Sequence, residues 1–151
     1  MLPTALLDVA ATDASTNTAK PITTKQAAVQ YLADVKPYNV AWDKFGAAFE
    51  KWAKHTGGTA AHTGTFANPM VAAISTFDHK VLSQRWPANA RSAIQTLVLD
   101  DAVLQGDLEG LPALNNLTLS SWAMSYRKDS TIDSAAADVV RSDLGLPLIK
   151  T

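Results

Sequence analysis

Histidine and aspartate side chains are the groups in this sequence that could hold a metal ion. Neutral imidazole and carboxylate are the nitrogen and oxygen ligands that zinc binds in proteins, and four such ligands complete a tetrahedral site. The spacing matches no named zinc motif, so only the fold could bring the ligands together. The alternative is that all three histidines are solvated surface side chains. The predicted ligands are His55, His62, His79 and Asp78.

A second set of candidates consists of aspartates that fall on apolar helical stripes. Asp101 interrupts one stripe, and Asp129 and Asp133 interrupt another. A buried carboxylate destabilises a fold unless it is paired or hydrogen-bonded. The pattern therefore predicts one of two arrangements. Either these carboxyl groups form an acidic pocket for a cation or a polar ligand, or they reach solvent or are satisfied by neighbouring donors.

Aromatic side chains could line a binding pocket beside these carboxyl groups. Rings give a pocket a large apolar area and, in tyrosine and tryptophan, a polar edge. The same rings also fill protein cores, so a fully closed core is the alternative interpretation. We assign five rings to a pocket for a small apolar or haem-like ligand: Tyr38, Trp42, Phe45, Trp122 and Tyr126.

The motifs of several enzyme classes are absent from the sequence. No G-x-S-x-G element, no phosphate-binding loop and no Glu-x-x-His pair of the di-iron bundles occurs. The chain has no cysteine, which excludes disulfides and thiolate chemistry. Thirteen basic residues balance fourteen acidic ones, and no apolar run reaches the ~20 residues that span a bilayer. We therefore expect a non-enzymatic protein with no cofactor, no nucleic-acid partner and no transmembrane segment.

One stripe of large apolar side chains organises residues 24–55. Its members follow one another at steps of three and four, which places them on one face of an α-helix. Thr23 and Gln26 form a capping-box pattern at the start. The stripe keeps its phase across Pro37, so we predict one kinked helix that ends at Gly57–Gly58. The members are Ala28, Tyr31, Val35, Tyr38, Trp42, Phe45, Phe49 and Trp52.

Three shorter amphipathic helices follow a predicted loop over residues 56–66. Proline at positions 69 and 87 indicates the first turns of the second and third helices, and Ser120 or Ser121 caps the fourth. Gly145, followed by proline, ends the fourth helix. No stretch alternates like a β-strand. The sequence predicts an all-α fold, a four-helix antiparallel bundle, with the later helices over about 69–84, 87–110 and 121–144.

The predicted organisation is one domain with two short ends. Residues 1–21 are small and polar without periodicity, which is typical of a flexible tail or tether. Residues 22–147 form the single helical domain, and residues 148–151 form a C-terminal tail. Residues 1–11 are either the end of a signal peptide that begins upstream or a flexible terminus.

Several segments together resemble a group of known proteins. They are Ala28–Trp42, the pairs Phe77–Asp78 and Trp86–Pro87, and the end of the last helix, AAADVVRSDLGLP, at residues 135–147. Together these segments resemble the uncharacterised, alanine-rich secreted or lipoprotein helical domains of actinobacteria. The resemblance implies a location outside the cytoplasm, secreted or at the cell envelope, with a tether at the N-terminal end. The cysteine of a lipoprotein anchor is missing, and no site residue is implied.

Three hypotheses about function follow. The first is a non-enzymatic extracytoplasmic binding or interaction module whose partner is a protein or a small apolar ligand. The second is a carrier of a small apolar or haem-like ligand within the aromatic pocket. The third is metal-dependent chemistry at the histidine and aspartate side chains.

Overall fold

The computed structural model describes residues 22–55 and 58–149. Within these residues the chain is all α, with four long helices, two short 3₁₀ helices and no strand. The all-α prediction is therefore confirmed, whereas the predicted tail at residues 1–21 lies outside the described residues. The long helices are α1 (Thr24–Ala53), α2 (Gly64–Ser83), α3 (Ala88–Gly110) and α4 (Leu119–Asp143), and the 3₁₀ helices are η1 (Ala60–Thr63) and η2 (Leu111–Ala113).

Helix α1 is one helix of 30 residues that contains Pro37, as predicted. The predicted capping box is present: the Gln26 amide donates to Thr23 Oγ1 at 3.2 Å, and the Thr23 amide donates to Gln26 Oε1 at 3.0 Å. Pro37 has no N–H to donate to the carbonyl one turn earlier. Burial of Tyr31 and Tyr38 on either side of it offsets that loss. The helix ends before the predicted Gly57–Gly58, with Lys54 as its C-cap.

The predicted start of the second helix is wrong. Helix α2 begins at Gly64, directly after η1, and Pro69 lies inside it rather than in its first turn. The segment before Pro69 is helical because it packs into the core: Ala67 is fully buried, and the Phe66 ring lies 5.8 Å from the Phe45 ring. This tertiary packing outweighs the single backbone hydrogen bond that Pro69 removes.

The other helix ends agree with the sequence in part. Pro87 is the N-cap of α3 rather than its first residue, and α4 begins at Leu119, before both predicted serine caps. The turn before α4 is formed by Asn115, whose Oδ1 accepts the Thr118 amide at 3.0 Å. Gly145 has a positive φ of 69°, and the amides of Gly145 and the following residue bond back into the last turn of α4. Those two bonds form a Schellman motif, so the predicted stop at Gly145 is confirmed.

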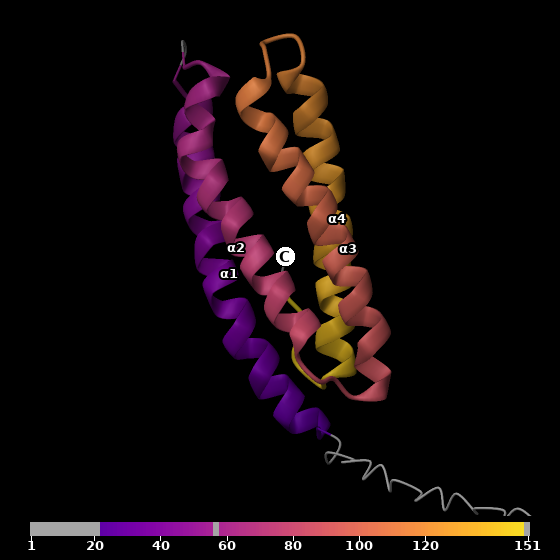
Figure 1. Cartoon of the computed structure of the whole chain (residues 1–151). Helices are drawn as coiled ribbons and strands as arrows, with labels where there is room; N and C mark the ends of the chain where they lie inside the picture. The colour runs from indigo at the N-terminus through magenta and orange to yellow at the C-terminus, as the bar shows by residue number, and fades with distance from the viewer. Residues whose placement is uncertain (1–21, 56–57, 150–151) are drawn as a thin grey trace, which may run out of the picture.

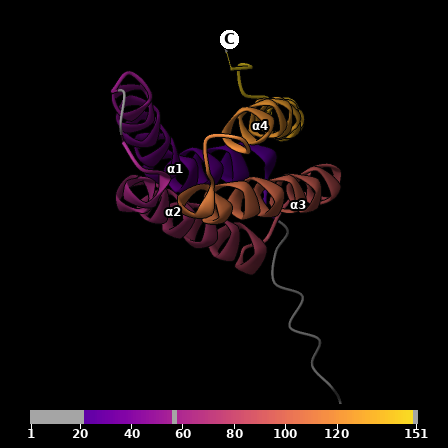
Figure 2. The same ribbon diagram turned by 90° about the horizontal axis from the view of Figure 1, so that it is seen from above.

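Each helix packs against the next one in the chain. Figure 1 and Figure 2 show α2 beside α1 and α4 beside α3, with the short turn after Ser83 joining the two halves. Helices α1 and α4 meet mainly through large rings, such as Trp42 and Tyr126 with centroids 6.2 Å apart. The fully buried side chains that the helices share include Tyr31, Met70, Ile74, Val81, Ile94, Leu104, Leu108 and Val140.

Candidate functional site

A polar centre lies inside the packed helices where a core would normally be apolar. The hydroxyl of Tyr38, on α1, donates a hydrogen bond of 2.7 Å to Oδ1 of Asp101, on α3. The same hydroxyl lies 3.5 Å from Oδ2 of Asp133, on α4. Three helices therefore contribute one polar side chain each to a single cluster.

The carboxyl groups of this cluster are buried and only partly satisfied. Asp101 is 0% exposed and Asp133 is 6% exposed. Oδ2 of Asp101 and Oδ1 of Asp133 have no hydrogen-bond partner within residues 22–55 and 58–149. The ion pairs among the described residues, Lys54–Glu50 and Lys80–Asp34, involve neither group. Unsatisfied buried carboxylates are costly, so this centre calls for a functional explanation.

The environment of these two carboxyl groups favours their protonated, neutral forms. Burial first, and then the charge of Asp133, raises the pKa of Asp101 to about 9. Burial is also the main cause that raises the pKa of Asp133 to about 7. Burial, together with the charges of both aspartates, raises the pKa of the Tyr38 hydroxyl far above its ordinary value. The phenol therefore stays protonated and acts as a hydrogen-bond donor.

Helix α2 adds a third carboxyl group to the centre. Asp78 is half-buried, and its Oδ1 has no hydrogen-bond partner. Burial raises the pKa of Asp78 to about 6, and, besides burial, the charge of Asp78 in turn raises the pKa of Asp101. Asp78, which the sequence suggested as a metal ligand together with histidines, thus lies with Asp101 instead. All four helices contribute to the polar centre.

A cavity of about 390 Å³ opens onto this centre, and we call it the Tyr38 cavity. Its size is within the range of about 300–1,000 Å³ that is usual for small-molecule sites. Asp101 and Asp133 both line this cavity. Each of these two carboxyl groups has one oxygen without a hydrogen-bond partner among the described residues. The other lining residues are the aromatic Tyr31, Tyr38, Trp42 and Phe77, the polar Asn39, Asp43, Ser134 and Arg141, and the apolar Val35, Leu97, Ala137 and Ile149.

Of the five rings assigned to a pocket, Tyr38 and Trp42 line the cavity and three do not. Phe45 stacks on Trp42 with ring centroids 5.8 Å apart, and it does not line the cavity itself. Trp122 and Tyr126 stack on each other at 4.9 Å and extend the same row of rings away from the cavity. These three rings therefore pack behind the cavity wall.

The three predicted stripe aspartates also separate into two places. Asp101 and Asp133 meet at the polar centre, where a neighbouring donor, the Tyr38 hydroxyl, satisfies one oxygen of Asp101. Asp129 lies instead beside Asp107, whose pKa is raised by burial and then by the charge of Asp129. The carbonyl of Asp107 also accepts the Trp122 indole N–H at 2.8 Å. Asp129 is not part of the Tyr38 cavity.

The histidines are exposed and have local partners rather than shared ones. His55 Nδ1 lies 2.7 Å from the Lys51 carbonyl oxygen, and His62 Nδ1 lies 3.1 Å from Thr59 Oγ1. His79 lies on the exposed side of α2. In the part of the chain that the structure describes, no group of three or more histidine, aspartate or glutamate side chains is arranged to hold a metal ion. The predicted zinc site gains no support from this arrangement.

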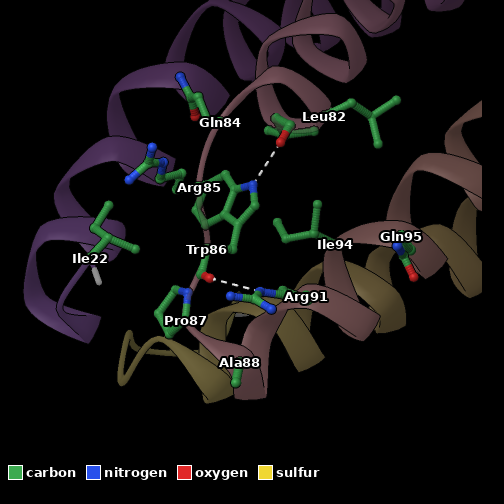
Figure 3. A pocket seen from close by; sticks show the side chains of 11 residues that line it. Ile22, Leu82, Gln84, Arg85, Trp86, Pro87, Ala88, Arg91, Ile94 and Gln95 are labelled. Carbon is green, nitrogen blue, oxygen red and sulfur yellow. Dashed lines mark hydrogen bonds between the residues drawn. The ribbon is translucent and has the colours of Figure 1, made fainter. Parts of the chain in front are cut away.

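A larger hollow of about 800 Å³ lies beside Trp86, at the turn between α2 and α3. Figure 3 shows Arg85 and Arg91 at this hollow, with the Trp86 carbonyl accepting a hydrogen bond of 3.1 Å from Arg91 Nε. Both arginines are exposed. The Trp86 indole N–H donates to the Val81 carbonyl at 2.6 Å, so this ring is held as a structural anchor. Because its charged groups are already solvated, this hollow has less binding potential than the Tyr38 cavity.

Sequence reasoning missed four polar residues at the cavity: Asn39, Asp43, Ser134 and Arg141. Asp133, Ala137 and Arg141 recur at intervals of four along α4, so they share one face. This spacing of four could have placed Arg141 on the same helix face as Asp133. The sequence offered no way to tell that this face looks onto Tyr38, because the rotation of α4 depends on its packing against α1 and α3.

None of the helices in residues 22–55 and 58–149 combines the length and apolar composition needed to cross a membrane. The chain matches no protein-family model, no curated protein and no solved structure. The resemblance to actinobacterial helical domains therefore stays a prediction. The geometry of the Tyr38 cavity is the basis on which function has to be argued.

Proposed function

We propose that this protein is a non-enzymatic binding module: an antiparallel four-helix bundle, bent at Pro37, that holds a small ligand in the Tyr38 cavity. In this proposal it works outside the cytoplasm, secreted or at the cell envelope. The location is supported by the resemblance to secreted actinobacterial helical domains. The binding role is supported by the cavity itself.

One observation carries the proposal. The Oδ2 atom of Asp101 is buried and has no partner, and its carboxyl group borders a cavity whose walls include Tyr31, Trp42 and Phe77. Leaving a polar atom in this state costs about 1–3 kcal/mol of stability. A bound ligand that donates to this atom would remove the cost, and the rings would cover an apolar body. The combination of apolar walls with a few convergent polar groups is typical of small-molecule sites.

The cavity chemistry favours a small ligand over haem, which was one version of the carrier hypothesis. Haem iron needs an axial ligand such as histidine, methionine, cysteine or tyrosine. Among the described residues, no histidine or methionine lines the Tyr38 cavity, and the hydroxyl of Tyr38 is already bonded to Asp101. Burial raises the pKa of the Tyr31 hydroxyl, which disfavours the phenolate form that would bind haem iron. A small molecule with an apolar body and a hydrogen-bond-donating end is the better fit.

Binding can be tested by filling the cavity with a larger side chain. Ala137 lines the cavity from α4, whereas Ala135 is exposed on the same helix. We expect compounds with an apolar body and a donor group to change the tryptophan fluorescence of the chain, through Trp42 in the cavity wall, in a saturable way. The Ala137→Leu variant should lose this response, and the matched Ala135→Leu variant should keep it. If the two variants respond alike, or if no compound binds the unmodified chain, the proposed function is wrong.

A further inference from the structure

We infer that the group received by the Tyr38 cavity is the primary ammonium of a small organic amine, held between Asp101 Oδ2 and Asp133 Oδ1. This inference rests on the proposed binding function and names its ligand class. Three independent features of the cavity support it: the hydrogen-bonding capacity left at its base, the charge around it and the rings in its wall.

The first feature is an excess of acceptors at the base of the cavity. A phenol has one O–H, and that of Tyr38 is used by Asp101 Oδ1 at 2.7 Å. Asp101 Oδ2 and Asp133 Oδ1 have no hydrogen-bond partner among the described residues, so the only donor at the pair is the proton that it retains, although both side chains are at least nine-tenths buried. A single ligand group that satisfies both atoms at once must carry at least two hydrogens. A primary ammonium, with three N–H donors, meets this requirement.

The second feature is the sign of the charge around this base. Asp101 from α3 and Asp133 from α4 line the cavity, and, besides burial, the charges of Asp100 from α3 and of Asp78 from α2 lie close enough to raise the pKa of Asp133. Helix α1 contributes the neutral Tyr31 and Tyr38, and also Asp43 in the cavity wall. Arg141 is the cationic residue in the lining, but it makes no ion pair with these aspartates, and its Nε donates to the Pro147 carbonyl. The charge that is missing from the centre is therefore positive.

The third feature separates an organic cation from a metal ion. The described residues contain no group of ligating side chains arranged for a metal. Tyr38 and Trp42, whose rings lie 6.1 Å apart, form an aromatic wall beside the carboxyl groups. Such rings attract an ammonium through their negatively charged faces and also cover the apolar part of the ligand. A metal ion would leave these rings and most of the cavity volume unused.

A consequence of this arrangement is that amine binding releases a proton. Burial and mutual repulsion keep the Asp101–Asp133 pair partly protonated at neutral pH. The ammonium takes the place of that proton, so the free pair and a protonated amine give the complex plus one proton in solution. The affinity should then rise about tenfold per pH unit between pH 7 and 9, while an alkylamine with a pKa of about 10.4 stays protonated.

Calorimetric titration of the full chain with matched ligands tests this inference. The probes are primary amines from methylamine to 2-phenylethylamine, the alcohols of the same shapes, and the corresponding trimethylammonium compounds. We expect at least one primary amine to bind more than tenfold tighter than its alcohol and its trimethylammonium analogue. Titrations at pH 7.5 in phosphate and in Tris should differ in heat by an amount that corresponds to about one released proton.

The outcomes distinguish the inference from the proposed function beneath it. If the alcohols bind as tightly as the amines, with no proton release, the ammonium assignment is wrong and the binding function stands. If Mg²⁺ or Zn²⁺ alone binds tighter than every amine, the assignment to an organic amine is also wrong. If none of the probes binds, both the inference and the proposed function fail.

Variants at two aspartates provide the structural control. Asp101→Asn keeps an acceptor for Tyr38 but removes the charge, so it should lose at least tenfold in amine affinity and should no longer release a proton. Asp133→Asn should act in the same direction, which guards against an effect peculiar to one variant. Asp129→Asn, outside the cavity on the same helix as Asp133, should bind the amine like the unmodified chain. Equal binding by Asp101→Asn and the unmodified chain would overturn the inference.

Discussion

The Tyr38 hydroxyl and the Asp101 carboxyl group, 63 residues apart in sequence, are joined by a buried hydrogen bond of 2.7 Å. This bond ties α1 to α3, which are not neighbours in the chain, through the centre of the helices. It also fixes one oxygen of Asp101 and leaves the other free toward the cavity. The same hydrogen bond therefore holds two helices together and orients the Asp101 carboxyl group at the cavity.

Removing this hydroxyl should destabilise the fold. Tyr38→Phe keeps the ring but leaves Asp101 without its donor, and the loss of a hydrogen bond to a buried carboxyl group costs about 1–3 kcal/mol. Urea denaturation followed by circular dichroism measures the free energy of unfolding. Tyr126→Phe, at a half-buried tyrosine whose hydroxyl makes no hydrogen bond to another described residue, is the matched control and should change stability by less than about 0.5 kcal/mol. Equal losses in the two variants would mean that the bond contributes nothing.

Stability should also fall as the pH rises. In an unfolded chain an aspartate has a pKa of about 3.9, whereas burial and the charge of Asp133 raise the pKa of Asp101 in the folded chain to about 9. Between these values the folded protein binds more protons than the unfolded one, so raising the pH favours unfolding. The melting temperature should therefore decrease from pH 5 to pH 9.

The Asp101→Asn variant isolates the residue responsible for this slope. Asparagine cannot ionise, and Asp78 and Asp133, with pKa values of about 6 and about 7, complete most of their own titration below pH 8. Between pH 8 and 9 the melting temperature of the variant should therefore depend much less on pH, and at pH 9 it should exceed that of the unmodified chain. Asp129→Asn should leave the slope unchanged. A slope that persists in Asp101→Asn would assign the pH dependence to other groups.

The helices could be predicted from sequence better than their ends. The spacing of Tyr31, Tyr38 and Phe45 indicates one helix through Pro37, because a stripe that keeps its phase needs no break. The start of α2 could not be predicted in the same way. Pro69 favours a first-turn position locally, but packing of Phe66 against the Phe45 ring extends the helix backward, and that contact depends on the tertiary fold.

The site was predictable only as far as single helices allow. Asp101 and Asp133 stand out because each interrupts an apolar stripe, so the sequence marks them as buried or unusual. It cannot say that they meet, or that Asp129, one turn before Asp133, lies beside Asp107 instead. Which residues of two stripes share a cavity depends on the rotation and offset of the helices, and these are set by packing.

Two glycines should respond to alanine in opposite directions. Gly145 has φ of 69°, in the left-handed region, so Gly145→Ala should destabilise the end of α4 by about 1 kcal/mol. Gly46 lies exposed inside α1, and a Cβ atom there meets nothing within 4 Å. Gly46→Ala should therefore stabilise the chain by about 0.5–1 kcal/mol. Thermal unfolding of the two variants measures both changes, and a gain at Gly145 would contradict the Schellman ending.

Arg141 should weaken amine binding in the unmodified protein. It lines the Tyr38 cavity as a cation, and it makes no ion pair with Asp101 or Asp133. Arg141→Gln removes a charge that repels the ammonium, so the amine should bind about three- to tenfold tighter, the effect expected for one charge across a partly screened site. Calorimetric titration at 20 mM and 500 mM salt measures this change, and the difference between the two proteins should shrink at high salt. Arg127→Gln, an exposed arginine of α4 outside the cavity, is the control and should bind like the unmodified chain. Weaker amine binding in Arg141→Gln would instead mean that the cavity recognises an anionic group, and it would contradict the ammonium assignment.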